Sequence, residues 1–514
     1  MTCHILPVCL VEGLERLEST SDTYLWESLL ADLQWHHNNV STDGSLVLTN
    51  GDAATPKRKR PLPPPVIPAS AFYNAPLADF MEAMKSGNVK VEVRIYDYDE
   101  PSSNTKSYWL ATIYKVVYGY MLLLRFEGMD RDGDEKYDFW INAGSADLRP
   151  AEYWHLVPPK SIQDRQSDWH SYVLNRVNAT NTLSHKWPVM QRNSIVNGRF
   201  KVNSRLELLD RLESTRIRPA RVINQMGRRI CVRVSASDMC KEHLKAENDA
   251  QMLDGVWLDE SSNLLFPVGW AAYNRYGLQA NEAYIKHSKA IANALRSKQR
   301  QPYAPFDVTF QLFRDWTENK SDKAVHWQVG WKLECLDPLN STFLELRVAT
   351  CVELLQDGFI KLGFDGPEME EESLPIHSTS PLLFPVGYGA KYNVNVRGPD
   401  TSTEFSWNEY LMQCQATAAP EELFDPIPPP EALAKFQIGG KLEAVDMCEP
   451  NLICPATIVA IKGRLLRVHY DGWDDDMDQM FDYRSRDILP IGWCQMYGYH
   501  LEHPKNDKTS SAKK

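Results

Sequence analysis

The chain has 514 residues, 43% hydrophobic and 24% charged, which is enough apolar material for several packed cores. Its formal net charge of -12 argues against free nucleic acid as the main partner, because duplex binding requires a basic face that displaces counterions. We therefore expect no sequence-specific DNA binding, and a basic partner suits such an acidic protein better.

The ten cysteines are scattered and include no C-x-x-C pair, so neither a zinc ribbon nor a secreted disulfide framework is expected. Cys240 and His243 are the nearest approach to half a metal site, and no second half accompanies them. We expect no metal and no cofactor. No apolar run is long enough to span a membrane, and the Cys3–Val11 stretch lacks a basic flank, which predicts a soluble intracellular protein without a membrane partner.

Two regions precede the main body of the chain. Residues 1–50 form an N-terminal segment that could belong to a first helical arm, and residues 51–71 form a proline-rich linker. The linker contains Pro-Lys-Arg-Lys-Arg-Pro at 56–61, a basic cluster typical of a nuclear import signal. A solvated run of charges is the alternative interpretation.

One sequence frame then occurs four times. Each copy opens on a short motif: KVEV at Lys90, RLELLD at Arg205, KLECLD at Lys332 and KLEAVD at Lys441. Each closes on a second motif: PAEY at Pro150, PVGW at Pro267, PVGY at Pro385 and PIGW at Pro490. The spacing exceeds the roughly 20 to 50 residues of a solenoid unit, so each copy is expected to be a domain with its own core. We assign repeats 1 to 4 to residues 72–160, 161–285, 286–400 and 401–505, followed by a polar tail at 506–514.

Within each copy the apolar pattern has period two. Residues 458–461 and 465–470 predict two short strands around the turn at 462–464, and residues 120–126 are the counterpart in the first copy. A small, strongly bent antiparallel barrel fits this pattern best. Segments with helical spacing and proline stops, such as 405–411 and 167–173, precede the barrels and are expected to pack as arms on a neighbouring barrel.

Five motifs together resemble malignant brain tumour (MBT) repeats, which are relatives of the Tudor barrels. They are the W-x-x-Y-L arm, K-L-E-A-V-D, C-x-A-T, F/Y-D-G-W and P-x-G-W-C, and the resemblance covers roughly residues 72 to 505. Four copies, the last the best preserved, are similar to the four-repeat subgroup of Sfmbt-type proteins and the four-repeat nematode homologue. The resemblance implies a mainly β fold with helical arms, built from four tandem MBT repeats.

The last repeat carries the residues that form a methyl-lysine pocket in such repeats. Asp446, Tyr470 and Trp473 match the pocket positions, and Cys454 matches a wall position. Aromatic faces attract an alkylammonium by about 0.5 to 2 kcal/mol each. A carboxylate accepts a charge-assisted hydrogen bond from a remaining N–H, which favours mono- and dimethyl-lysine over trimethyl-lysine. Two core aromatics at a strand end are the alternative interpretation of Tyr470 and Trp473.

The cage departs from the family pattern at one position. Met477 stands where the third aromatic is expected, with Met480 and Phe481 just beyond it. Methionine is polarizable but has no aromatic face, so a wider or weaker cage is expected. Asp474, Asp475, Asp476, Asp478 and Asp482 surround this site, and they either steer a basic tail toward it or form a solvated acidic loop.

The other three copies depart from the cage pattern in different ways. Repeat 3 has Asp337 and Phe364 but Pro367 in place of the tryptophan, and repeat 2 has Asp210 but Val234 in place of the aromatic. Repeat 1 offers the aromatics Phe126, Tyr137 and Trp140, which could line a shallow pocket, then Met129 and the loosely placed Asp97. We interpret these three copies as scaffold or docking modules.

The resemblance implies a nuclear, chromatin-associated reader of methylated histone H3 or H4 tails that acts with repressor-complex proteins. A scaffold that assembles such a complex without reading methylation is the alternative. An enzyme is not expected, because the chain lacks G-x-S-x-G, a phosphate loop, H-E-x-x-H and a glycine-rich cofactor fingerprint. A Cys454 nucleophile would have only His469 as a nearby base in sequence.

Overall fold

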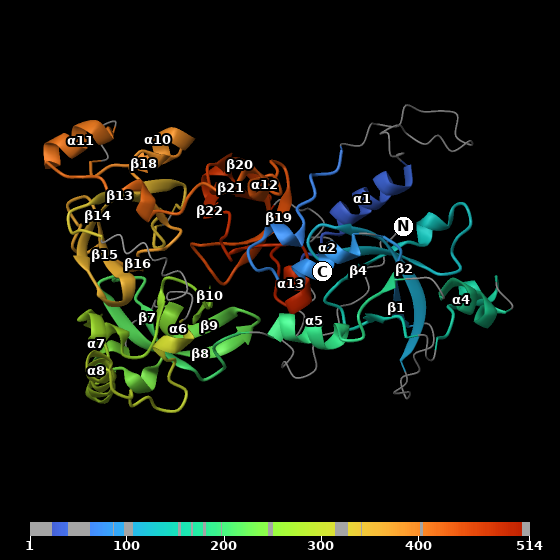
Figure 1. Cartoon of the computed structure of the whole chain (residues 1–514), viewed down its shortest axis with the longest axis horizontal. Helices are drawn as coiled ribbons and strands as arrows, with labels where there is room; N and C mark the ends of the chain where they lie inside the picture. Colours follow the sequence, from blue (N-terminus) through green and yellow to red (C-terminus); the bar gives the residue numbers. More distant parts are fainter. Residues whose placement is uncertain are drawn as a thin grey trace.

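Four sheets form the body of the protein, and each has five antiparallel strands in the same order (Figure 1). In the first three sheets a short sixth strand also pairs in parallel with one of these five. The computed structural model describes residues 23–39, 62–85, 87–96, 106–152, 156–165, 168–177, 181–196, 198–244, 250–313, 327–340, 342–400 and 405–505. In every sheet the fourth, third, second, first and fifth strands are neighbours in that order, and a bulge interrupts the second strand at the same place. A bulge bends its strand, so the repeated bulge accounts for the curled half-barrel of each copy.

Repeat 1 contains the sheet at the right of Figure 1. Its strands are β1 (Val89–Ile95), β2 (Ser107–Val117), β3 (Met121–Phe126), β4 (Phe139–Asn142) and β5 (Leu148–Pro150), and β6 (Asn181–Thr182) pairs with β1. Its short helices are η1 (Ala69–Ala71), α2 (Ala78–Met84) and η2 (Asp134–Tyr137), and α1 (Glu27–Asn39) lies N-terminal to them.

Repeat 2 begins with the helices α3 (Lys160–Gln163), α4 (Trp169–Val177) and α5 (Trp187–Val196). Its strands are β7 (Arg205–Leu209), β8 (Arg216–Met226), β9 (Arg229–Val234), β10 (Val256–Asp259), β11 (Leu265–Phe266) and β12 (Gly277–Leu278). Its other helices are η3 (Ala236–Asp238), η4 (Lys241–Leu244), α6 (Ala250–Leu253) and α7 (Trp270–Asn274).

Repeat 3 begins with the long helix α8 (Glu282–Arg296) and η5 (Phe310–Leu312). Its strands are β13 (Lys332–Cys335), β14 (Glu345–Leu354), β15 (Phe359–Phe364), β16 (Leu374–His377), β17 (Leu383–Phe384) and β18 (Asn395–Arg397). Its remaining helices are η6 (Gln356–Gly358) and α10 (Tyr388–Tyr392).

Repeat 4 begins with α11 (Trp407–Cys414), η7 (Glu421–Leu423) and α12 (Pro430–Leu433). Its strands are β19 (Lys441–Val445), β20 (Ile453–Lys462), β21 (Leu465–Tyr470), β22 (Gln479–Asp482) and β23 (Ile488–Leu489), and its other helices are η8 (Asp475–Met477) and α13 (Trp493–Tyr497). The strands predicted at 458–461 and 465–470 are therefore confirmed, and Gly463 turns between them with a φ of +64°.

The repeated sequence motifs contact one another inside each barrel. In repeat 4, Lys441 Nζ lies 2.6 Å from Thr457 Oγ1 and 2.7 Å from Asp471, so the first lysine, the Ala-Thr pair and the Asp-Gly-Trp motif form one polar triad. Repeat 3 builds the same triad from Lys332, Thr350 and Asp365. A buried ammonium requires such partners, which explains why these three motifs recur together.

In repeats 2, 3 and 4 the glutamate of the opening motif caps the helix of the closing motif. The Glu443 carboxylate accepts from the backbone N–H groups of Gly492 (2.7 Å) and Cys494 (2.8 Å) at the start of α13. Glu334 and Glu207 do the same in repeats 3 and 2. Burial raises the pKa of Glu443, and these donors oppose that rise, as expected for a carboxylate at a helix N-terminus.

The arms pack on neighbouring barrels, as predicted. Trp407 of α11 donates its indole N–H to Glu334 of repeat 3 at 2.8 Å, and the Trp169 ring of α4 lies 5.7 Å from that of Trp109 in repeat 1. Trp26, just before α1, donates to Glu443 of repeat 4 at 3.2 Å. The first and the last parts of the chain are thereby joined.

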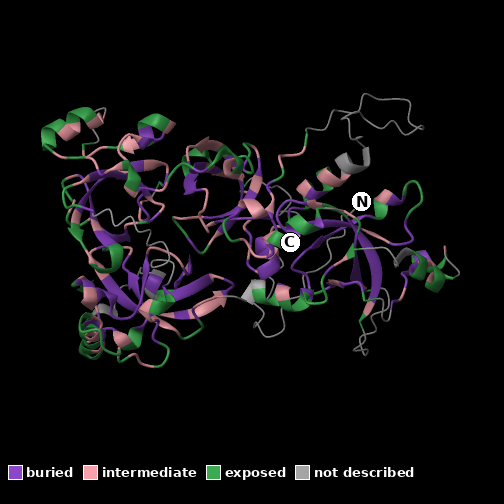
Figure 2. Cartoon of the chain, in the orientation of Figure 1, coloured by how far each residue is buried: buried purple, intermediate pink, exposed green. Residues whose placement is uncertain are grey.

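Repeat 4 lies at the centre of the molecule, between repeat 1 and the pair formed by repeats 2 and 3 (Figure 1). Asn142 of repeat 1 donates to the Gly492 carbonyl at 2.8 Å, and Arg229 of repeat 2 pairs with Asp487 at 3.1 Å. Arg464 donates to the Leu383 carbonyl of repeat 3 at 2.6 Å. Figure 2 shows buried residues concentrated in the sheets, with exposed outer faces on the arm helices. Repeat 4 is thus supported by all three others.

Candidate functional site

Three strands bring the predicted cage residues to one end of the repeat 4 barrel. Cys454 on β20 pairs with Ala444 on β19, and Tyr470 at the end of β21 pairs with Ala456 on β20. Asp446 follows β19 directly, and its backbone N–H donates to the Leu452 carbonyl at 3.0 Å to close the intervening turn. Cys454 and Tyr470 are buried, with 5% and 4% of their surface exposed, so they form a floor rather than a rim.

Gln479, at the start of β22, connects Asp446, Met447 and Tyr470 by hydrogen bonds. Its amide Nε2 donates to Asp446 Oδ1 at 2.8 Å, while its Oε1 accepts from the backbone N–H of Met447 at 2.9 Å. The Tyr470 hydroxyl has two hydrogen-bond acceptors within reach. The Val445 carbonyl lies at 2.7 Å and Oε1 of Gln479 at 2.8 Å. The sequence analysis missed Gln479, because no residue motif marks a buried amide.

Trp473 and Met477 stand at the outer edge of the site. Gly472 has a φ of +84°, and the backbone N–H of Trp473 donates to the Tyr470 carbonyl at 3.0 Å, so the Asp-Gly-Trp motif is a tight turn that requires glycine. Trp473 is 39% exposed and Met477, at the end of η8, is 51% exposed. In contrast, Met480 and Phe481 are buried in the barrel.

The electrostatics of the floor favour a cation and exclude a nucleophile. Burial, with a smaller effect of the Asp446 carboxylate, raises the pKa of the Cys454 thiol to about 12 and the pKa of Tyr470 well above its ordinary value. Cys454 is therefore a neutral wall at physiological pH. Asp446 supplies negative charge at the edge of this apolar floor.

Only part of the predicted acidic steering loop is available. Asp478 is buried against Arg467 (2.7 Å) and His469 (2.8 Å), and Asp482 is buried in an ion pair with Arg464. Neither a steering role nor a solvated loop therefore describes Asp478 and Asp482, since buried, paired carboxylates project little field. Asp474, Asp475 and Asp476 remain exposed.

No metal site follows from the same cluster. His469, Asp475 and Asp478 are the residues within the described ranges whose ligand atoms lie within 4.8 Å of one another. However, Asp478 already pairs with Arg467, so the cluster is a network that anchors the loop.

Among the helices of the described residues, none is long and apolar enough to cross a membrane.

The position of Cys454 distinguishes repeat 4 from the others. The strand register places Trp109, Arg218 and Arg347 at the same site in repeats 1, 2 and 3, since they pair with Val93, Leu208 and Cys335 as Cys454 pairs with Ala444. All three are large side chains, whereas cysteine is small. The wall residue therefore decides how much space remains between the aspartate and the aromatic.

In repeat 3 an arginine of the protein occupies the cage position. The guanidinium carbon of Arg347 lies 4.2 Å from the centroid of the Phe364 ring, and Nη1 lies 2.8 Å from Asp337. This cation sits between a carboxylate and an aromatic face, as a methylated lysine would between Asp446 and Tyr470. Repeat 3 is thus filled by its own side chain.

Repeats 1 and 2 are filled in other ways. In repeat 2 the buried Arg218 lies 3.3 Å from Asp210, which also pairs with Arg216 at 2.6 Å. In repeat 1 the cage positions belong to one apolar cluster, packed against the arm helix α4. Its members at these positions are Ile95, Trp109, Phe126 and Met129. Ile95 replaces the aspartate, while the predicted Asp97 lies outside the described residues.

The remaining aromatics predicted for a repeat 1 pocket are separated. Trp140 is 1% exposed and lies in the barrel core, whereas Tyr137 is 45% exposed. The structure does not bring them together as cage walls.

Repeat 2 holds the loop that carries Asp446. Arg211 donates to the carbonyls of Met447 (3.1 Å) and Cys448 (3.4 Å), and Arg229 donates to that of Pro450 (2.8 Å). The backbone N–H of Trp257 donates to Asn451 at 2.9 Å. Residues 446–451 are therefore fixed from outside their own barrel.

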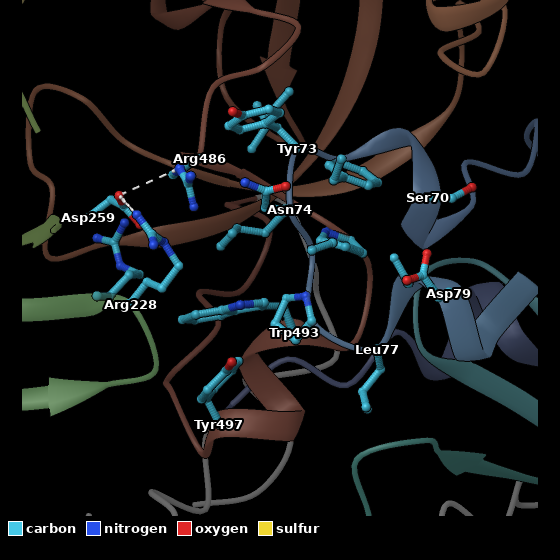
Figure 3. Close-up of a pocket in the computed structure, with 18 of the residues that line it drawn as sticks. Ser70, Tyr73, Asn74, Leu77, Asp79, Arg228, Asp259, Arg486, Trp493 and Tyr497 are labelled. Carbon is cyan, nitrogen blue, oxygen red and sulfur yellow. Dashed lines mark hydrogen bonds and ion pairs between the residues drawn. The ribbon is translucent and has the colours of Figure 1, made fainter. Parts of the chain in front are cut away.

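A separate hollow lies away from the candidate cage. A cavity of about 700 Å³ lies where the 70–80 segment, repeat 2 and repeat 4 meet (Figure 3). Its walls include Tyr73, Trp493 and Tyr497, and its charged groups include Arg228, Arg486 and Asp259. Asp259 lies 3.2 Å from Arg228 and 3.9 Å from Arg486, so this one carboxylate is shared by two guanidinium groups.

Comparison with known proteins agrees with the geometry. A family profile described as the mbt repeat matches residues 98–163, 204–285, 331–403 and 440–508. The chain therefore belongs to the MBT-repeat family, and both the resemblance and the fold class predicted from the sequence are confirmed. These repeats are binding modules, which agrees with the prediction that the chain is not an enzyme.

Particular relatives are similar over most of the chain. It is 38% identical to protein lin-61 of Caenorhabditis elegans over 460 residues, covering 85% of this chain and 73% of that protein. It is 31% identical to Polycomb protein Sfmbt of Drosophila melanogaster over 456 residues, covering 85% of this chain but 35% of Sfmbt. MBT domain-containing protein 1 of Homo sapiens is 33% identical over 454 residues, which cover 86% of this chain and 65% of that protein.

A solved structure is similar in fold. The four MBT repeats of Drosophila melanogaster Sfmbt, crystallised with the peptide RHR(me)KVLR, superpose with a TM-score of 0.72 at 28% identity. The match covers 94% of this chain and 99% of that one.

Proposed function

We propose that the chain is a chromatin-associated reader that binds methylated lysine on histone tails and acts in transcriptional repression. The ligand side chain would enter between Asp446, Tyr470 and Trp473, over the thiol of Cys454 and beside Met477. The observation that carries the proposal is the contrast at the wall position: repeat 4 has a small, neutral cysteine where the other repeats have Trp109, Arg218 and Arg347.

The chemistry of the floor supports a partly methylated ammonium. Oδ1 of Asp446 already accepts from Gln479 and from the backbone N–H of Cys448 at 2.9 Å, so the other oxygen is the one to accept a ligand N–H. A trimethylated lysine has no such N–H, and mono- and dimethyl-lysine are therefore the preferred ligands. The rim consists of one exposed tryptophan and a methionine, so the cage would contact the methylated lysine side chain more than the neighbouring residues of the peptide.

The similar proteins support a role for the chain in chromatin. Sfmbt is described as a Polycomb protein, and its four repeats were crystallised with a peptide that carries a methylated lysine. We accordingly propose a nuclear protein that contacts histone H3 or H4 tails and repressor-complex proteins. The basic cluster at 56–61 would serve nuclear import, although it lies outside the described residues.

Trp473→Ala tests the cage. Removing an aromatic wall should weaken binding of RHR(me)KVLR by about 5- to 30-fold, or about 1 to 2 kcal/mol, in calorimetric titration. Because Trp473 is 39% exposed, the melting temperature should change little. Tyr73→Ala, which removes a similarly exposed aromatic at the separate 700 Å³ cavity, is the control. Unchanged affinity in Trp473→Ala would place the ligand elsewhere, whereas equal binding of the methylated and the unmethylated peptide by the wild type would favour a scaffold role.

A further inference from the structure

The C-terminal segment lies beside the start of β20, the strand that carries Cys454. The Tyr499 hydroxyl donates to the Asn451 carbonyl at 2.7 Å, and the backbone N–H of Glu502 donates to the Ile453 carbonyl at 2.9 Å, one residue before Cys454. Leu501 is 2% exposed, and its backbone N–H donates to Thr23 Oγ1 at 2.9 Å. The segment is therefore anchored next to the cage on both sides.

The anchored segment places Lys505 next to the ring of Trp473. Lys505 Nζ lies 4.6 Å from the centroid of the Trp473 ring, within the range of a cation–π contact. Lys505 is exposed, as Trp473 partly is, so the ammonium keeps much of its hydration. A methylated ammonium is less strongly hydrated and should displace it from the aromatic face.

We propose that the C-terminal segment is an intramolecular competitor that places Lys505 on the rim of the cage until a methylated lysine displaces it. The inference rests on the proposed function. It differs from the filled cages of repeats 2 and 3, because Arg218 is buried and the Arg347 side chain is only 13% exposed, whereas Lys505 is exposed on the surface.

The expected effect is modest and measurable. A cation–π contact at an exposed site biases the population by about two- to fivefold, and an occupied site lowers the apparent affinity by the same factor. The competitor is tethered, so its strength is independent of protein concentration. Loss of the contact should therefore raise the affinity for methylated peptide by about two- to fivefold.

Lys505→Ala in the full chain, titrated with RHR(me)KVLR, tests the proposal. We expect tighter binding in this variant, wild-type affinity in Lys505→Arg, which keeps a cation over the ring, and no change in Lys289→Ala, an exposed lysine of α8. In a Trp473→Ala background, Lys505→Ala should give no gain, whereas a general effect of lost positive charge would persist there.

Three results would overturn the proposal: unchanged or weaker binding in Lys505→Ala, an equal gain in Lys505→Arg, or the same gain without Trp473. Failure of the proposed function looks different. In that case the wild-type chain binds the methylated and the unmethylated peptide equally, whatever residue stands at 505.

Discussion

Cys454→Arg is expected to abolish binding of methylated peptide without unfolding the protein. The introduced guanidinium would meet Asp446 and the ring of Tyr470, as Arg347 meets Asp337 and Phe364 in repeat 3. An arginine at this strand position is therefore compatible with the barrel, and its charge has a partner. The cage would be occupied by a side chain that no ligand can displace by mass action at ordinary concentrations.

Cys454→Ser is the matched control, because it keeps the small wall residue. Peptide binding should fall by far less than in Cys454→Arg, and thermal unfolding should show both variants folded. Full binding by a folded Cys454→Arg protein would mean that the ligand does not enter between Asp446 and Tyr470.

Deleting residues 72–285 should lower both the melting temperature and the peptide affinity, although no cage residue is removed. The deletion takes away Arg211, Arg229 and Trp257, which hold the 446–451 loop, and Asn142, which bonds to Gly492. A barrel of this size buries too little surface to be stable without neighbours. Differential scanning calorimetry and peptide titration would measure the two losses.

The isolated fragment 401–505 should be more severely affected, because it lacks Trp26 as well. That residue is 4% exposed and donates to the buried Glu443, while Trp407 of the fragment loses Glu334 as its acceptor. Loss of a buried tryptophan alone costs about 3 to 5 kcal/mol. A fragment that unfolds cooperatively with the stability and the affinity of the full chain would contradict this interdependence.

The period-two pattern and the repeated motifs predicted the barrels well, since the first four strands of each repeat pair with their sequence neighbours. The arms were also predictable, because Trp169 and Trp407 recur at similar distances before the opening motifs at Arg205 and Lys441. The contact of Trp26 with Glu443 was not, because it joins the two ends of the chain and no local pattern encodes such a pairing.

For the candidate site, the resemblance to MBT repeats pointed to Asp446, Cys454, Tyr470 and Trp473, and their placement around a ligand remains a proposal. It did not find that the residue opposite Ala444, Val93, Leu208 and Cys335 fills the other cages, because that equivalence depends on strand register. The burial of Asp478 and Asp482 was missed for a related reason. Asp478 pairs with Arg467 on β21, and Asp482 pairs with Arg464 just before β21, whereas the sequence shows only an acidic run.

The central claim is that repeat 4 alone reads lysine methylation. Calorimetric titration of the full chain with RHR(me)KVLR and its unmethylated form, repeated with Asp446→Asn, Asp210→Asn and Asp337→Asn, tests it most directly. Asp210 and Asp337 are already paired with arginines of their own repeats, so their replacement should cost stability while the folded protein still binds. We predict a clear preference of the wild type for the methylated peptide and its loss in Asp446→Asn alone. Equal binding of the two peptides, or equal losses in all three variants, would contradict the account.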